Sequence, residues 1–159
     1  MDKKTELEML QMLENIPIPP NKPFLLTSSD CKTVKVSREL ISYFNKIIDQ
    51  KNAVSQNAYY HLAECYLKLD EKTAALNAFK NATQMKFKPE IKKDAWLNYA
   101  KLSYEIGNPY KSVPEVLQEY IELYPNSSHK KEINDLIISA YITSKDYEGA
   151  LSFLKNKKS

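Results

Sequence analysis

The strongest constraint on this chain is a pattern of small, aromatic and aliphatic residues that recurs at a fixed spacing. The first copy occupies two segments of helical spacing: Tyr59, Leu62, Ala63 and Tyr66, then Ala75, Phe79 and Ala82. Later copies carry Trp96, Tyr99 and Ala100, then Val113, Leu117 and Tyr120, and finally Ile137, Ile138, Tyr141, Ala150 and Leu154. Tyr66 and Tyr141 are 75 residues apart, as are Ala75 and Ala150, which gives two periods of about 37 residues. Three copies in phase predict a helical repeat protein.

The residue types in this pattern are those that packed pairs of helices need. Ala63 and Ala100 are small enough to let two antiparallel helices approach closely, while Tyr59 and Trp96 fill the space between helix pairs. A single helical hairpin cannot bury its apolar face alone and has to stack on its neighbours. Only two glycines occur, which disfavours turn-rich β architectures. We therefore predict an all-α solenoid of antiparallel helix pairs.

The repeat domain is predicted to span residues 37–159, with repeats at about 56–89, 93–126 and 131–157. A helix over residues 37–50 precedes the repeats and begins at Ser37, a good N-cap. Its apolar face carries Leu40, Ile41, Phe44, Ile47 and Ile48. Residues 1–36 are expected to form a short helix over 6–15 and then an irregular segment, because Pro17, Pro19 and Pro20 end the helical pattern.

The stretch from about residue 55 to residue 154 resembles the tetratricopeptide repeat family. The segments NAYYHLAECYLKLDEKTAALNAF, WLNYAKLSYEIGNPYKSV and KDYEGALSFL are most similar to the interior of long bacterial arrays of this family, including cell-envelope assembly scaffolds. The resemblance implies a right-handed α-solenoid. Residues 21–36 depart from the family pattern, so the N-terminal segment is either a capping structure or a sign that the chain is a fragment of a longer protein. We favour the second interpretation.

The resemblance also implies a binding groove, because proteins of this family generally bind partners on the concave surface lined by the first helix of each repeat. The positions that fall there are Asn57, Tyr60, Glu64, Leu67, Lys68, Asp94, Leu97, Lys101, Tyr104, Glu105, Glu132, Asp135 and Ser139. We expect Tyr60 and Tyr104 to be exposed aromatic anchors for an extended peptide or a partner helix. Asp94 and Glu132 would repel a terminal carboxylate, which argues against the peptide-tail binding of chaperone-associated members.

Signals for other functions are weak. His61 and His129 have no nucleophile or orienting acid at helical spacing, so we predict that the chain is not an enzyme and holds no metal or cofactor. Cys65 is expected to point inward, whereas Cys31 lies in the irregular segment. Arg38 is the single arginine and the net charge is only +3, which disfavours nucleic-acid binding. No apolar run approaches the roughly 20 residues of a membrane-spanning helix, so direct insertion is not expected.

The predicted function is therefore a protein–protein interaction scaffold that binds a peptide or helix in the groove. The alternative is a regulatory or non-catalytic part of a larger multi-domain protein or envelope assembly. By itself the chain fits a cytoplasmic protein, and as part of a longer exported protein it would be periplasmic or envelope-associated. The helix that carries Leu151, Phe153 and Leu154 lacks a covering element, so we also expect an exposed apolar strip and self-association.

Overall fold

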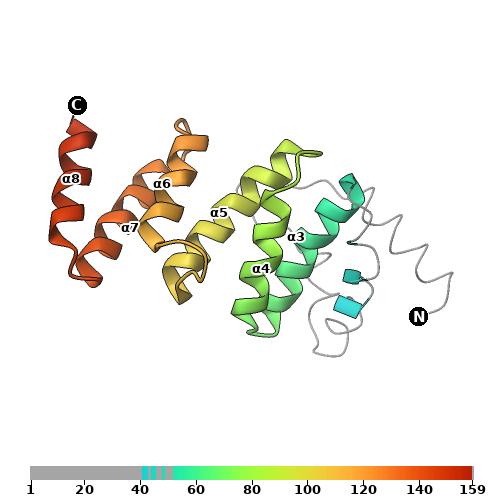
Figure 1. Cartoon of the computed structure of the whole chain (residues 1–159). Coiled ribbons are helices and arrows are strands. Elements are labelled where there is room, and N and C mark those ends of the chain that lie inside the picture. Colours follow the sequence, from blue (N-terminus) through green and yellow to red (C-terminus); the bar gives the residue numbers. More distant parts are fainter. Residues whose placement is uncertain (1–40, 43, 46–47, 49–51, 159) are drawn as a thin grey trace, which may run out of the picture. The chain divides into compact units, whose positions relative to one another are not determined.

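A computed structural model of the chain describes residues 41–42, 44–45, 48 and 52–158 (Figure 1). Within these residues the regular secondary structure is all helical, and no strand is present. The six long helices are α3 (Ala53–Lys68), α4 (Lys72–Thr83), α5 (Pro89–Ile106), α6 (Val113–Leu123), α7 (Lys130–Thr143) and α8 (Tyr147–Lys158). The all-α prediction is confirmed, while the right-handed course and the repeat boundaries stay predictions. Of the helix expected over 37–50, residues 41–42 and 44–45 are helical, and the segment 1–36 lies outside the described residues.

Capping boxes set the starts of two helices. At α3, the amide of Ser55 donates to Asn52 Oδ1 at 3.0 Å, and the amide of Asn52 donates back to Ser55 Oγ at 2.7 Å. At α6, Ser112 and Glu115 make the same reciprocal exchange, and Pro114 occupies the first turn. Both devices satisfy amides that the first helical turn leaves without an intrahelical partner.

The 75-residue period is visible in the turns that end α3 and α7. Asp70 and Lys145, which are 75 residues apart, both adopt a left-handed backbone, with φ of 58° and 63°. After each, the amide of the next residue donates to the carbonyl of Tyr66 or Tyr141, at 2.8 Å in both cases. This is the hydrogen-bond pattern of a Schellman motif, which ends a helix and reverses the chain. The turns that end α3 and α7 therefore share one geometry at the spacing of 75 residues.

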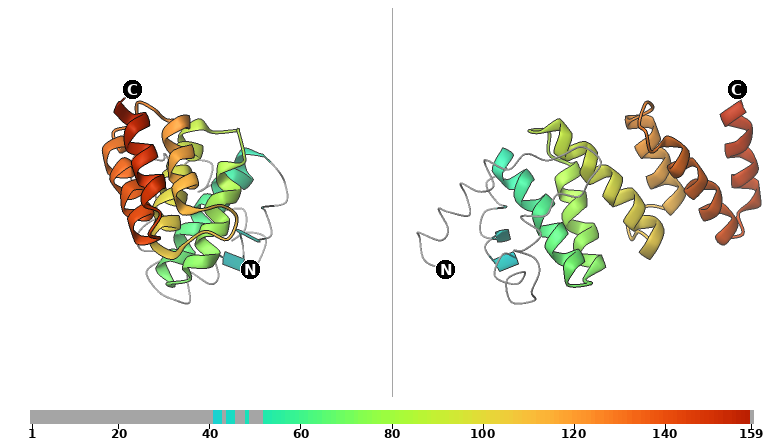
Figure 2. Two further views of the ribbon diagram at one scale, coloured as in Figure 1. Left: turned by 60° about the vertical axis from the view of Figure 1, so that its left-hand side comes forward. Right: turned by 180° about the vertical axis from the view of Figure 1, so that it is seen from behind.

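The molecule divides into two compact units, with the boundary inside α5 between Tyr99 and Ala100. In unit 1, up to Tyr99, helices α3 and α4 lie side by side (Figures 1 and 2). The side chains that the repeat pattern assigns to the core and that are buried here are Leu62, Ala63, Ala75, Phe79 and Ala82, and Leu76 is buried beside them. Burial of one large apolar side chain of this kind stabilises a fold by about 1.5–3 kcal/mol.

Unit 2 begins at Ala100 and contains the rest of α5 with α6, α7 and α8. Helix α7 packs against both α6 and α8. The residues buried in this unit include Val116, Leu117, Tyr120, Ile133, Ile137 and Ala150. The α6–α7 turn is tied down by a 2.7 Å hydrogen bond between the hydroxyl groups of Tyr120 and Ser127, and Ser127 Oγ also accepts from the amide of His129 at 3.1 Å.

The outer face of α8 carries apolar side chains in contact with solvent. Leu151 is 58% exposed and Tyr147 is 59% exposed, whereas Phe153 and Leu154 are half-buried. Self-association through this face stays a prediction. None of the helices in the described part of the chain combines the length and the apolar character needed to cross a membrane.

Candidate functional site

In unit 1, three of the predicted groove residues on α3 lie in the core. Asn57, Tyr60 and Glu64 are all buried, and only Lys68 at the end of the helix is exposed. The expectation that Tyr60 is an exposed anchor is wrong, because its side chain is 0% exposed. Its ring packs edge-on against Phe79 of α4, with ring centroids 5.9 Å apart. The helix is therefore covered on the side that was expected to face a partner.

The hydroxyl of Tyr60 is satisfied inside the protein by a residue of α5. Tyr60 donates a hydrogen bond to Asp94 Oδ2, and Asn98 Nδ2 donates to the same carboxylate oxygen at 3.2 Å. Asp94 and Leu97 are both buried, so the expectation that they line an open groove is also wrong. A buried carboxylate is costly unless hydrogen bonds satisfy it, and the two donors supply such bonds. This pair joins α3 to the first half of α5.

Gln56 is a structural residue that sequence reasoning missed. Its Nε2 donates to the carbonyl oxygens of Ala82 at 3.2 Å and Met85 at 2.8 Å, and its Oε1 accepts from the amide of Lys88 at 2.8 Å. One buried side chain thereby ties the start of α3 to the end of α4 and to the turn between α4 and α5. No local signal marks it, because a glutamine in the first turn of a helix is usually solvated.

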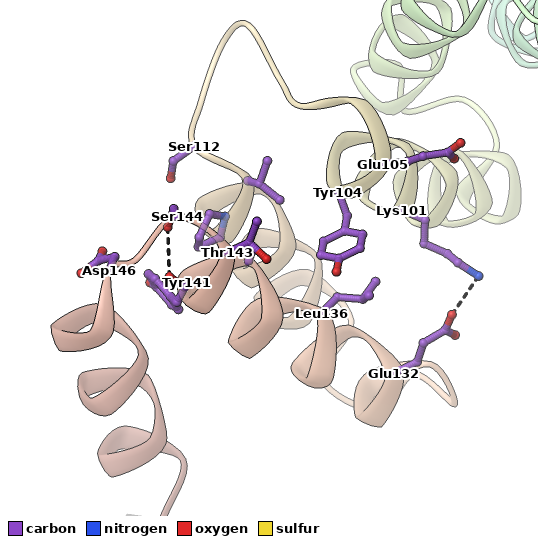
Figure 3. A pocket seen from close by; sticks show the side chains of 13 residues that line it. Lys101, Tyr104, Glu105, Ser112, Glu132, Leu136, Tyr141, Thr143, Ser144 and Asp146 are labelled. Carbon is purple, nitrogen blue, oxygen red and sulfur yellow. Dashed lines mark hydrogen bonds and ion pairs between the residues drawn. The ribbon is translucent and has the colours of Figure 1, made fainter.

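Unit 2 contains an open groove with a volume of about 840 Å³, lined by the second half of α5, the start of α6, and α7 with the turn that follows it (Figure 3). Its apolar lining consists of Tyr104, Val113, Pro114, Leu136 and Ala140. Figure 3 shows the ring of Tyr104 pointing from α5 towards Leu136 on α7. The groove is large enough to take several side chains of a bound peptide.

The structure brings together four of the positions expected to form a groove. Lys101, Tyr104 and Glu105 line it from α5, and Glu132 lines it from α7. Asp135 is exposed on α7 but does not line this groove. Three of the positions expected on α5 and one of those on α7 therefore meet at one surface, whereas Asp135 and Ser139 of α7 lie outside it.

An ion pair crosses one end of the groove. Lys101 Nζ lies 3.0 Å from Glu132 Oε1 (Figure 3), and His129 Nδ1 lies 3.2 Å from Glu132 Oε2. The hydrogen bond from Lys101 lowers the pKa of Glu132, partial burial opposes this shift, and the hydrogen bond from His129 adds to the lowering. Both Lys101 and Glu132 are almost half exposed, so the pair is screened by water and contributes little to stability.

Other side chains of the groove wall are held by neighbours within the unit. Tyr141 Oη accepts a hydrogen bond from Gln118 Nε2 at 2.8 Å, which fixes the ring against α6. Ser144 Oγ donates to the carbonyl of Tyr141 at 3.1 Å, and Asp146 Oδ1 accepts from the amide of Gly149 at 2.9 Å. Side chains that are already ordered lose less conformational entropy when a partner binds.

The expectation that His129 has no acidic residue at helical spacing is wrong, because its Nδ1 lies 3.2 Å from Glu132 Oε2. The other two described candidates, His61 and Cys65, lie inside the protein. His61 is buried and stacks on Phe44, with ring centroids 6.3 Å apart, and its ring also meets Tyr60 edge-on. Cys65 is a buried free thiol, which confirms that it points inward. In the parts of the chain that the structure describes, no three His, Cys, Asp or Glu side chains gather to hold a metal ion. Cys31 lies outside the described residues.

Comparison with known protein families identifies a tetratricopeptide repeat in unit 1. Residues 57–84 match the family model of this repeat, a stretch that runs from the first turns of α3 to the C-cap of α4. For this stretch the resemblance seen in the sequence is thereby confirmed, and for the later predicted repeats it stays a prediction. No curated protein and no solved structure gives a significant match to the chain.

Proposed function

Because this chain contains a tetratricopeptide repeat, a unit that generally mediates protein–protein interaction, we propose that it binds a peptide segment or a helix of a partner protein in the groove of unit 2. Members of this family are typically non-catalytic interaction modules. The proposed contact surface is the lining from α5, α6 and α7. Residues Asn57, Tyr60, Glu64, Asp94 and Leu97 have no part in it, since they are buried in unit 1.

The single observation that carries this proposal is the position of Tyr104. Its side chain is 38% exposed and stands at the wall of an apolar groove, opposite Leu136. Tyrosine is enriched among the residues that dominate binding energy at protein interfaces, because it offers a large rigid apolar surface and one polar atom. A half-exposed tyrosine in a preformed hollow is therefore a good anchor for a partner side chain.

The chemistry of the lining favours a polypeptide over a small polar metabolite. Apolar side chains of Val113, Pro114, Leu136 and Ala140 share the groove with polar groups at its rim. Helix-in-groove recognition uses this combination, in which an apolar stripe of the ligand enters the groove and its polar flanks remain in water. Because the groove is open to solvent, a bound chain segment has room to continue beyond both ends of the groove.

The proposal is tested by peptide display. The full chain is used to select peptides from a random library, and the selected peptides are remeasured by fluorescence anisotropy against Tyr104→Ala and Tyr147→Ala. Tyr147 is the matched control because it is also an exposed tyrosine of unit 2 and does not line the groove. We expect Tyr104→Ala to weaken binding by at least about tenfold and Tyr147→Ala to leave it unchanged.

Two results would refute this function. One is a selection that yields no peptide whose binding depends on Tyr104. The other is equal weakening by both variants, which would mean that neither tyrosine marks the contact surface. Far-UV circular dichroism of both variants has to match that of the unmodified chain, as expected for substitution of side chains that lie outside the buried core.

A further inference from the structure

On the basis of the proposed function, we further propose that the segment taken by the groove is amphipathic and cationic, with apolar side chains over Leu136 and a lysine or arginine at one or both flanks. The charges of the groove lining carry this inference. Among the described residues that line it, three bear carboxylates, Glu105, Glu132 and Asp146, and one bears an ammonium group, Lys101. The lining therefore has an excess of two negative charges.

The position of the one lining ammonium group makes the groove still less suited to an anion. Lys101 is already paired with Glu132 at 3.0 Å, and the second oxygen of Glu132 meets His129. An acidic ligand group would have to compete with Glu132 for Lys101 and would leave the Glu132 carboxylate with fewer partners. A cationic group can instead approach Glu105 or Asp146 without breaking this pair. Figure 3 shows these two carboxylates at opposite ends of the groove.

The helix ends at the groove add to the same electrostatic preference. Neither α5 nor α7 has a basic residue in its last turn, and residues Glu105, Thr143 and Ser144 from these two ends line the groove. The C-terminal end of a helix carries partial negative charge, although at α7 the amides of Ser144, Lys145 and Asp146 already donate to carbonyl groups of the last turns. The start of α6 also lines the groove, but a capping box between Ser112 and Glu115 occupies its amides.

The apolar lining excludes a segment that is only basic. Tyr104, Val113, Pro114, Leu136 and Ala140 can be covered favourably only by apolar side chains, and a lysine-rich strand would leave them in water. The occupant that satisfies both the lining and the rim has apolar residues at its centre and cationic residues at its flanks. Rim charges of this kind act mainly on specificity and association rate.

The test uses the peptides that display selection yields with Tyr104-dependent binding, remade with the same core and with lysine, glutamine or glutamate flanks. We expect affinity to fall in the order lysine, glutamine, glutamate. Glu105→Gln and Asp146→Asn should each weaken binding of the lysine-flanked peptide by about twofold to fivefold and leave the glutamine-flanked peptide unchanged. Asparagine caps helices about as well as aspartate, so its side-chain oxygen in Asp146→Asn can still accept the hydrogen bond from the amide of Gly149. A change in affinity therefore reports the loss of the negative charge.

Glu122→Gln provides the matched control, since Glu122 is an exposed glutamate of unit 2 that does not line the groove. This variant should bind all three peptides as the unmodified chain does. If the glutamine-flanked or glutamate-flanked peptides bind as tightly as the lysine-flanked one, with Tyr104 still required, the cationic preference is wrong and the proposed function stands. If no selected peptide depends on Tyr104, the proposed function itself fails.

Discussion

Replacing Gln56 with alanine removes three hydrogen bonds that join α3 to the end of α4 and to the turn between α4 and α5. The carbonyl oxygens of Ala82 and Met85 each lose a donor, and the amide of Lys88 loses its acceptor. Alanine is a good helix former, so the backbone of α3 itself has no reason to change. The substitution therefore isolates the contribution of one buried side chain to the packing of unit 1.

The expected loss follows from the burial of these groups. A hydrogen bond within a protein contributes about 1 kcal/mol net, and a buried group left without a partner costs about 1–3 kcal/mol. The bond to Ala82 is fully buried and the other two are partly buried, so water can replace part of what they lose. The three together give an expected decrease of about 3 kcal/mol in the free energy of unfolding.

The matched control is Gln118→Ala, which also removes a helical glutamine but breaks a single partly buried bond to Tyr141 Oη in unit 2. It should lower the free energy of unfolding by about 1 kcal/mol or less. Urea unfolding followed by far-UV circular dichroism compares the two variants. Amide hydrogen exchange adds a local measurement, because the Lys88 amide should lose protection in Gln56→Ala and keep it in Gln118→Ala.

This reasoning would be contradicted if Gln56→Ala lowered the free energy of unfolding by less than about 1 kcal/mol and left protection of the Lys88 amide unchanged. It would mean that the turn between α4 and α5 is held by its apolar contacts alone. Equal effects of the two glutamine substitutions would also count against a special role for Gln56.

Two further predictions concern unit 2. The pKa of Glu132 should lie below the usual glutamate range in a carboxyl-detected NMR titration, and it should rise in Lys101→Gln. Because this pKa is lowered in the folded state, the stability that the pair contributes is present at neutral pH and is lost as the pH falls through the folded-state pKa. Water screens the pair, so this contribution is below about 1 kcal/mol. Gly149→Ala should destabilise unit 2 by about 1 kcal/mol in thermal unfolding, although alanine has the higher helix propensity. The reason is that the new Cβ would lie 2.6 Å from the ring of Tyr141. An unchanged or raised melting temperature would show that the ring moves aside freely.

Much of the core could be predicted from the sequence because its signal is local. Leu62, Phe79, Leu117 and Ile137 are buried as their spacing predicts, since an apolar stripe of helical period has to face a packed surface. These features depend on residues within one or two turns of each other.

The candidate site could be predicted only in part. Lys101, Tyr104 and Glu105 do line a groove, but Tyr60 and Asp94 are buried partners whose hydrogen bond joins residues 34 positions apart. A tyrosine or an aspartate on a helix face is usually assigned to the surface, because alone it would be costly to bury. That cost disappears when the two groups meet, and no local pattern shows that they do.

The helical class of this protein, its repeat period and the apolar stripe of each helix can all be read from the amino-acid order, because periodicity and residue size act over short distances along the chain. The packing of distant helices is needed to know which polar positions of the first helices lie inside and which remain at a surface. The first helix of a stacked repeat is contacted on more than one side, so side chains from other helices decide whether each of its faces is buried. For this reason α3 places Tyr60 in the core of unit 1, whereas α5 leaves Tyr104 at the groove of unit 2.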